Sequence, residues 1–332
     1  MWSRAAPARL LGLFPARIER RRYGLAPPVL VGWTHPFAPF GTPLVDRDAG
    51  VAVVAAWLDH LAGRRDLPRL LLMPYLPASG AVAQAFASAL AANGGRSVAF
   101  GSHQRALLAP ADGRQDYLDR AIGAKKRKEL RRQRKRLAES GPLAAHIACE
   151  GAAFTAALAD FLALEASGWK GRAGTAAGAD AAIRAFVQKA ATGLAREGKA
   201  HIARLVLAER AIAALVTLRS GTAVWCWKIA YDEAFARSSP GVQLILDASQ
   251  ALLAERGIAC VDSCATAGHP MIDHIWRERL ALADQLLRPG RQHRFAFALA
   301  CTLERARRAA IAGLKRLRDL ARYRASPFRN RR

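Results

Sequence analysis

Residues 201–231 read HIARLVLAERAIAALVTLRSGTAVWCWKIAY, and this stretch decides the fold. It holds three apolar runs, which only Glu209-Arg210 and Ser220-Gly221 separate. Apolar runs joined by short polar turns are typical of antiparallel hairpins. The stretch therefore predicts a three-stranded meander over His201–Ala208, Ala211–Arg219 and Thr222–Tyr231.

Helical and extended segments flank the meander on both sides. Apolar residues at helical spacing predict amphipathic helices, and short apolar runs predict strands. Upstream we expect a strand over 143–149 and helices over 152–167 and 180–196. Downstream we expect a helix over 242–256, a strand over 258–265 and a helix over 270–283. The resulting order is β-α-α-β-β-β-α-β-α.

The N-terminal half alternates strands with helices, which argues for an α/β half-domain. We expect strands over 29–33, 69–73 (ended by Pro74) and 97–100, and helices over 48–61 and 81–92. One long basic helix should follow over 116–139, and another basic helix should cover 295–323. The predicted organisation is an N-terminal half 1–115, a connecting helix 116–140, a main domain 141–287 and a basic helical tail 288–332.

The formal net charge of +25 is confined to three segments. Residues 1–22, 125–136 and 288–332 carry +5, +8 and +12, so the rest of the chain is formally neutral. We therefore expect a neutral folded body with basic appendages. Such appendages can bind nucleic acid, anionic lipid or an acidic polymer. The alternative is that they are the solvated faces of arginine-rich helices.

Several classes of protein are disfavoured by the sequence. No apolar run is long enough to span a bilayer, and the patch Leu10–Phe14 is too short for a secretory signal. The five cysteines form no CxxC pair and no zinc spacing, and the histidines do not cluster. We expect a cytoplasmic protein with reduced thiols and no metal, which the basic segments can hold at the inner face of a membrane.

The segment between the meander and the next helix is a candidate anion site. Ser239 can cap the helix and Pro240 can occupy its first position, while Gly241 lets a ligand approach the backbone. The free N–H groups of the first turn and the helix dipole would then bind a pyrophosphate, and Arg237 would add a charge. The alternative is an ordinary capped helix start. The candidate residues are Arg237, Ser238, Ser239, Pro240, Gly241, Val242 and Gln243.

Several stretches together resemble one branch of the GNAT acyltransferases, the cellulose-biosynthesis-associated acetyltransferases, which are related to Fem-type aminoacyl transferases. The stretches are Lys125–Leu137, Phe161–Gly171, Tyr231-Asp232-Glu233 before Ser239-Pro240-Gly241, Asp262-Ser263-Cys264, His269-Pro270-Met271-Ile272 and Trp276. The resemblance implies an α/β (α+β) fold of tandem GNAT-like halves, with mixed, mostly antiparallel sheets flanked by helices. The first half would be degenerate and the second would hold the donor. The donor segment departs from the family pattern because it has a single glycine, so the donor's identity stays open.

The resemblance also implies an activity. The chain would be an N-acyltransferase that moves an acyl group, such as acetyl, from acyl-CoA as co-substrate to an amine or hydroxyl. The acceptor would be a small molecule or glycan of polysaccharide or cell-envelope metabolism. Two alternatives stay open. One is Fem-like transfer from charged tRNA, whose phosphates the helix over 125–136 would contact. The other is a non-catalytic binding protein on the same scaffold.

Acyl transfer to an amine needs a lost proton, a stabilised oxyanion and alignment. Asp232 or Glu233, near the end of the meander, and Asp262, within an apolar strand, are candidate bases; burial would raise the pKa of Asp262. The alternative for Asp262 is a core carboxylate bonded to backbone or to arginine. His269 is a candidate proton shuttle or a structural histidine. Candidate substrate-side residues, with a helix end and a packed tryptophan as their alternative, are Glu165, Trp169, Lys170 and Tyr231.

Overall fold

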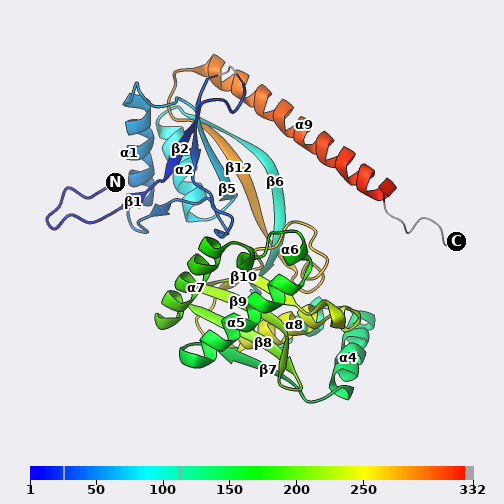
Figure 1. Cartoon of the computed structure of the whole chain (residues 1–332). Coiled ribbons are helices and arrows are strands. Elements are labelled where there is room, and N and C mark those ends of the chain that lie inside the picture. Colours follow the sequence, from blue (N-terminus) through cyan, green and yellow to red (C-terminus); the bar gives the residue numbers. More distant parts are fainter. Residues whose placement is uncertain (25–26, 112–113, 326–332) are drawn as a thin grey trace. The chain divides into compact units, whose positions relative to one another are not determined.

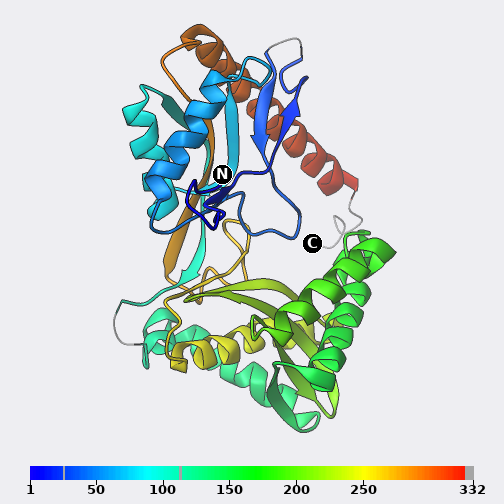
Figure 2. The ribbon, with the colours of Figure 1, turned by 90° about the vertical axis from the view of Figure 1, so that its left-hand side faces the viewer.

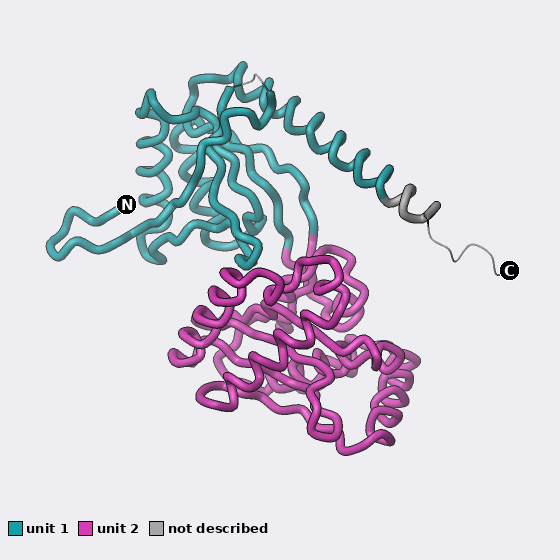
Figure 3. The backbone as a smooth tube through the Cα atoms, in the orientation of Figure 1, with its two compact units in different colours: residues 1–103, 281–332 teal, residues 104–280 magenta. Residues whose placement is uncertain are grey.

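The computed structural model describes residues 1–24, 27–111 and 114–325. The chain divides into two compact units, residues 1–103 with 281–332 and residues 104–280 (Figure 3). It passes from one unit to the other within strands β6 (Arg96–Leu108) and β12 (Glu278–Arg288). This division differs from the expected boundaries near residues 115, 140 and 287. The C-terminal segment, expected as a separate tail, belongs to the first unit.

The second unit follows the predicted element order up to its last strand (Figure 1). Its helices are α3 (Tyr117–Ala121), α4 (Ala124–Glu139), α5 (Gly151–Ser167), α6 (Trp169–Arg172), α7 (Ala181–Arg196) and α8 (Pro240–Ala254), with 3-10 turns η1 (Ala177–Ala179) and η2 (Glu233–Ser238). Its strands are β7 (Leu143–Ala148), β8 (Ala200–Leu207), β9 (Arg210–Ser220), β10 (Ala223–Tyr231) and β11 (Cys260–Asp262).

The predicted meander is confirmed, because β8 pairs antiparallel with β9 and β9 with β10. β7 adds an antiparallel strand beside β8, and β11 lies parallel to β10. The last residues of β6, Leu107 and Leu108, pair antiparallel with β11. The sheet of this unit is therefore mixed and mostly antiparallel, as the resemblance implied.

Helices cover both faces of this sheet (Figure 2), and the alternating side chains of β8 contact one helix on each face. Leu205 packs in one core with Leu244 and Ile245 of α8. Its neighbour Arg204 points the other way and pairs with Asp160 of α5 at 2.6 Å. Successive side chains of a strand point to opposite faces, so α5 and α8 cover opposite faces of the sheet.

Two helix predictions in this part of the chain are wrong. The single helix expected over 116–139 is broken into α3 and α4, because Ile122 is extended and Gly123 is the N-cap of the second helix. The helix expected over 270–283 is a turn followed by β12. The side chains of Ile272, Ile275 and Trp276 are buried at helical spacing, but in this turn the indole N–H of Trp276 donates to Ser249 Oγ of α8 at 2.9 Å.

The first unit also holds a sheet between two helical layers. The strands of this sheet are β2 (Ala16–Glu19), β3 (Val29–Gly32), β5 (Leu71–Pro77) and most of β6 and β12, while β1 (Gly12–Leu13) and β4 (Leu44–Val45) form a separate two-stranded sheet. The helices of the unit are α1 (Gly50–Gly63), α2 (Ala81–Ala92) and α9 (Arg294–Ala325). Leu71 and Met73 of β5 share a core with α1 and α2, whereas Leu70 and Leu72 share one with Phe297 of α9. The relation of this unit to a degenerate GNAT half stays a prediction.

The sequence predicted that this strand would end before Pro74, but β5 continues through Pro74 to Pro77. The pairing of β5 with β12 changes register between Ala283 and Gln285, next to Pro74 and Tyr75. Tyr75 has a φ of 51° and donates its N–H to Asp284 Oδ1 at 2.9 Å. A bulge thus accommodates the proline, which cannot donate to a ladder.

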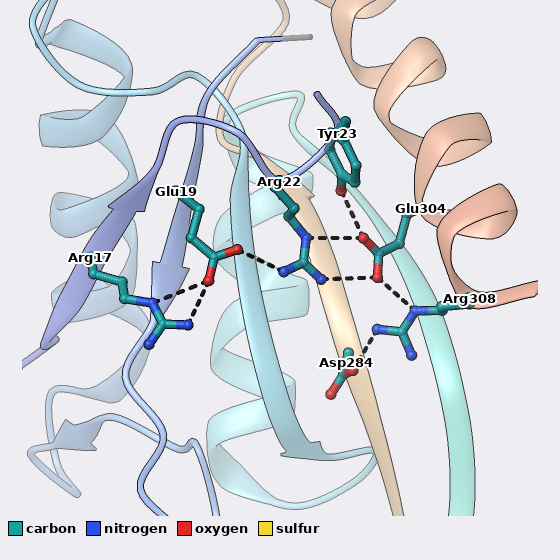
Figure 4. A network of polar contacts seen from close by, with 7 residues as sticks. All are labelled: Arg17, Glu19, Arg22, Tyr23, Asp284, Glu304 and Arg308. Atoms are coloured by element: carbon teal, nitrogen blue, oxygen red, sulfur yellow. Dashed lines mark hydrogen bonds and ion pairs between the residues drawn. The ribbon is translucent and has the colours of Figure 1, made fainter. Parts of the chain in front are cut away.

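The basic N- and C-terminal segments are not simple appendages. The buried carboxylate of Glu304 on α9 accepts two hydrogen bonds from Arg22, each of 3.0 Å, and one from Tyr23 Oη at 2.9 Å (Figure 4). Arg308 Nε donates to the same carboxylate at 2.7 Å. Arginines from residues 1–22 and 288–332 therefore form part of the interior polar network of the first unit.

Candidate active site

Strands β10 and β11 separate after a short parallel contact. They pair only from Ala223 to Trp225, opposite Cys260 to Asp262, while β10 continues to Tyr231. A bulge between Cys226 and Lys228 shifts the pairing of β10 with β9 at the same place. Within the described residues, no strand pairs with this edge of β10 beyond Trp225. The edge can therefore accept an extended ligand through backbone hydrogen bonds.

The start of α8 lies directly after this strand and η2. Pro240 is the first helical residue, as predicted, but Ser239 makes no side-chain cap. Its backbone adopts the left-handed conformation, with φ 51° and ψ 53°, which a serine seldom takes outside functional or strained segments. Ser239 therefore occupies the N-cap position, as predicted, but its hydroxyl does not cap the helix. The N–H groups of the first turn therefore receive no hydrogen bond from the Ser239 side chain, and a helix start of this kind favours an anion.

The remaining residues of the predicted loop have different surroundings. A Cβ on Gly241 would lie 3.0 Å from Met271 Cε and 3.2 Å from Tyr231 Cδ1, so these side chains fill the space expected for a ligand. Gln243 is buried and donates to the backbone oxygen of Leu130 at 2.8 Å, which fixes α4 on α8. Ser238 and Val242 are half-buried, and Arg237 is exposed.

Glu165 and Lys170, both predicted as substrate-side residues, are in direct contact. The fully buried Glu165 carboxylate accepts from Lys170 Nζ at 3.2 Å, from Lys228 Nζ at 2.8 Å and from the N–H of Ala177 at 2.8 Å. Lys170 Nζ also donates to the backbone oxygen of Ile229 at 3.1 Å. This lysine–glutamate cluster, made of Glu165, Lys170 and Lys228, joins α5, α6 and β10 beside the open edge.

Sequence reasoning did not identify Lys228. A signal was present, because a lysine stands in the apolar run VWCWKIAY, where a buried ammonium needs a counter-charge. The position of that counter-charge, 63 residues earlier in the chain, depends on the tertiary fold.

The contacts around Glu165 keep its carboxylate ionised. Burial alone would raise the pKa of Glu165, but the hydrogen bond from Lys228, the N–H of Ala177 and the charges of both lysines together lower it. Burial lowers the pKa of Lys170, against the attraction of Glu165. Glu165 is therefore ionised at neutral pH and engaged by three donors, which suits a positioning role better than proton abstraction.

The two candidate bases are also engaged by partners. Asp262 is buried, pairs with Arg105 and accepts from the N–H of Cys264 at 2.9 Å. Burial raises its pKa, and the Arg105 charge and the N–H of Cys264 oppose that shift. Asp262 is therefore a core carboxylate bonded to backbone and to arginine, which was the alternative interpretation.

Asp232 has a similar arrangement at the end of the meander. Its carboxylate accepts from the N–H of Ala234 at 2.9 Å at the start of η2, and it forms an ion pair with Arg210. These contacts use the carboxylate of Asp232 to cap a turn and to hold an arginine. Neither aspartate thus presents an unpaired carboxylate to the open edge of β10.

His269 lies in the segment after β11. Its Nδ1 accepts from the N–H of Met271 at 3.3 Å. Burial and the charge of Lys170 lower its pKa, against the charge of Asp273. The ring is therefore neutral at pH 7, and its proton belongs on Nε2, which makes Nε2 a donor. Such a donor suits stabilisation of a developing oxyanion.

Trp169 begins α6, next to Lys170. Its N–H donates to Glu233 Oε1 at 2.7 Å, and Arg172 pairs with the other oxygen of Glu233 at 2.6 Å. The Trp169 residue is 57% exposed. The alternative in which this tryptophan is packed as a plug is therefore wrong.

A cavity of about 650 Å³ lies between α3, α4 and α8. Its floor is apolar, with Leu118, Leu130 and Leu246 among the lining residues, and arginines 127, 131 and 134 line its rim. Arg127 pairs with Asp119 at 2.6 Å and Arg134 with Asp247 at 2.9 Å. The predicted basic helix thus combines an apolar surface with several cations.

Comparison with known proteins defines the class of the second unit. Residues 124–269 match the family model described as an acetyltransferase (GNAT) domain, which is less than half of the chain. This range contains the meander, the open edge of β10 and the start of α8. The second unit thus carries a GNAT-type domain, the fold of a family of acyltransferases. Among curated proteins, none matches the sequence.

Solved structures share the fold over most of the chain. L-PGS from Bacillus licheniformis is 13% identical, with a TM-score of 0.51, over 89% of this chain and 85% of that one. The C-terminal domain (DUF2156) of a putative lysylphosphatidylglycerol synthetase from Agrobacterium fabrum is 14% identical, with a TM-score of 0.52, over 88% and 84%. FemX is 11% identical, with a TM-score of 0.50, over 84% and 89%. At these identities the likeness concerns the fold alone.

The described residues lack a candidate metal centre and a helix that could span a membrane. Among them, no three histidine, cysteine, aspartate or glutamate side chains gather in a way that could hold a metal ion. In that same part of the chain, no helix has both the length and the apolar character needed to cross a bilayer.

Proposed function

We propose that the second unit is an N-acyltransferase that takes its acyl group from acyl-CoA. The observation that carries the proposal is that, among the described residues, no strand pairs with β10 beyond Trp225, next to the start of α8, where no side chain caps the helix. An extended amide-bearing arm can pair with such an edge, and a pyrophosphate can accept from the N–H groups of a helix start. Arg237 is exposed beside this start and adds a positive charge.

The acceptor side of the site is proposed at the lysine–glutamate cluster. Lys170 and Lys228 hold Glu165 beside the open edge, and the Nε2 proton of His269 is available as a donor. Because Glu165, Asp232 and Asp262 are all in ion pairs, we propose that the acceptor amine arrives neutral and attacks the thioester carbonyl. The C–S bond then breaks, the CoA thiolate leaves, and the amine releases its proton to water. The chain would then accelerate transfer through orientation and oxyanion stabilisation.

The finer parts of the function are proposals of the same kind. We propose acetyl-CoA as the donor and an amino group of a small molecule or glycan as the acceptor, in the cellulose-associated branch of the family. The basic segments would hold the protein on the cytoplasmic side of an anionic membrane or against an acidic polymer.

The surface of α4 favours a second candidate, aminoacyl transfer from charged tRNA. Exposed cations of α4 and the arginines at the rim of its cavity match a phosphate backbone. Two of the solved structures that share the fold are FemX and a domain of a putative lysylphosphatidylglycerol synthetase. This candidate needs the same domain but a different donor.

Calorimetry with acetyl-CoA, a longer acyl-CoA and tRNA separates the two. The first proposal expects micromolar acyl-CoA binding, weakened about tenfold or more by Arg237→Glu. Arg256→Glu, beyond the other end of α8, is the matched control and should bind normally. Tight, salt-sensitive tRNA binding without acyl-CoA binding would favour the second candidate. A protein that binds neither donor would refute both.

A further inference from the structure

Arginines line a cavity of about 300 Å³ in the first unit. The cavity lies among the end of α1, the turn after α2 and the loop from β12 to α9, and every lining residue belongs to this unit. Three of its lining side chains are Arg69, Arg288 and Arg291, and one is acidic, Asp59. The Asp59 carboxylate accepts from Asn93 Nδ2 at 2.6 Å. Throughout the described residues, none of the three arginines forms an ion pair with a carboxylate.

The excess of positive charge in this cavity is unfavourable because Arg288 is buried. It is 6% exposed, and its guanidinium donates only to backbone oxygens, those of Gly290, Gln292 and Gly94. Its Nε is buried and has no hydrogen-bond partner among the described residues. Burial, and then the charges of Arg294 and Arg96, lower its pKa. A buried cation without a counter-charge is unfavourable, so an anion in this cavity would stabilise the fold.

The neighbouring backbone adds donors and space. Helix α9 begins at Arg294, one residue after His293 of the cavity wall, and it is 32 residues long. Its first-turn N–H groups and its dipole favour an anion at this end. Gly94 has a φ of +62°, and a Cβ there would lie 2.5 Å from Arg291 Cγ. The missing side chain therefore lets Arg291 lie close over the turn.

We propose that this arginine cavity binds a phosphate monoester. Guanidinium groups and helix N–H groups are the donors that phosphate oxygens prefer. The volume suits a phosphate on a small body, and Leu61, Ala62 and Pro289 offer apolar contact to that body. The phosphate comes either from a soluble metabolite or from a lipid headgroup. This site is additional to the acyl-transfer site, because no residue of the second unit lines it.

The test uses the full chain with two probes, inorganic phosphate and vesicles that contain phosphatidic acid. We expect phosphate to raise the melting temperature and to bind in calorimetry. Arg291→Gln should weaken binding about tenfold. Arg47→Gln removes one exposed charge before the opposite end of α1 and is the matched control for the overall charge. Arg291 is chosen because Arg288→Gln would release three backbone oxygens and could unfold the loop.

The outcomes are distinct. Phosphate binding that Arg291→Gln weakens and Arg47→Gln does not supports the site with a soluble ligand. Vesicle binding that follows the same pattern and that inorganic phosphate competes away supports the site with a lipid source. Repeating the series with Arg237→Glu separates this site from the proposed pyrophosphate contact. The proposal would be overturned if Arg291→Gln and Arg47→Gln weakened phosphate binding equally. It would also be overturned if neither inorganic phosphate nor the vesicles bound.

Discussion

The carboxylate of Glu165 is fully buried, and its two lysine partners reach it from different elements. A glutamine at this position keeps the shape of the side chain but leaves two ammonium groups without their common counter-charge. We expect Glu165→Gln to lower the free energy of unfolding by about 3–5 kcal/mol, the usual cost of breaking a buried ion pair. Urea titration would measure this loss.

The same helix offers the control for this variant. Asp160 of α5 pairs with Arg204, but its side chain is 39% exposed. Asp160→Asn should therefore cost no more than about 1 kcal/mol. Equal losses for the two variants would mean that the cluster adds nothing beyond a surface ion pair.

The pKa of Glu165 gives a second expectation at the scale of the residue. Burial opposes its ionisation, but the Lys228 hydrogen bond and the other contacts lower its pKa below the ordinary value. The unfolded chain therefore binds this proton at a higher pH than the folded chain. Its contribution to stability is complete above the unfolded pKa, about 4.3, and is lost as the pH falls through the folded pKa.

The stability difference between the wild type and Glu165→Gln should accordingly narrow as the pH falls below about 4. Urea titrations at a series of pH values between neutral and acidic would measure it. A difference that stays constant over the whole range would show that the carboxylate pKa is the same in both states.

Helix α6 is only four residues long, and contacts outside it must hold it. Glu233 accepts from the N–H of Trp169 and from Arg172, which fixes both ends of the segment that carries Lys170. Removing this acceptor should open the segment locally. We expect Glu233→Ala to raise amide exchange over 169–173 about fivefold, which corresponds to roughly 1 kcal/mol.

Hydrogen exchange with mass spectrometry would measure this effect. Glu233→Gln keeps an oxygen for the N–H of Trp169 and should raise exchange less. Unchanged exchange in both variants would mean that packing against α5, and not Glu233, holds the short helix.

The sequence predicted local elements well and long-range contacts poorly. The turn residues beside each strand indicate the meander, so its prediction over His201–Tyr231 requires no knowledge of tertiary contacts. The turn at 270–275 buries apolar side chains at the spacing of a helix, so periodicity alone cannot separate the two. The sequence leaves Asp262 open between a base and a core carboxylate, because its partner, Arg105, stands 157 residues earlier. Burial and pairing decide the role of such a residue, and both depend on the complete fold.

The two units of the molecule have separate cores. One cluster of buried residues contains β8, β9 and α8, and two others contain α1, α2 and α9 with the strands of the first unit. Each unit also has its own buried glutamate, Glu165 in the second and Glu304 in the first. Separate cores of this kind can unfold as separate cooperative units.

Variants at these two glutamates test that independence. Glu304→Gln leaves Arg22 and Arg308 without their shared counter-charge, and we expect a loss of about 3–5 kcal/mol in the first unit. Hydrogen exchange in moderate urea would locate each loss. Glu304→Gln should speed exchange over residues 1–103 and 281–325, whereas Glu165→Gln should speed it over residues 104–280. Faster exchange throughout the chain in both variants would contradict independent units, because it would mean that the strands passing between them, β6 and β12, make the whole molecule unfold as one.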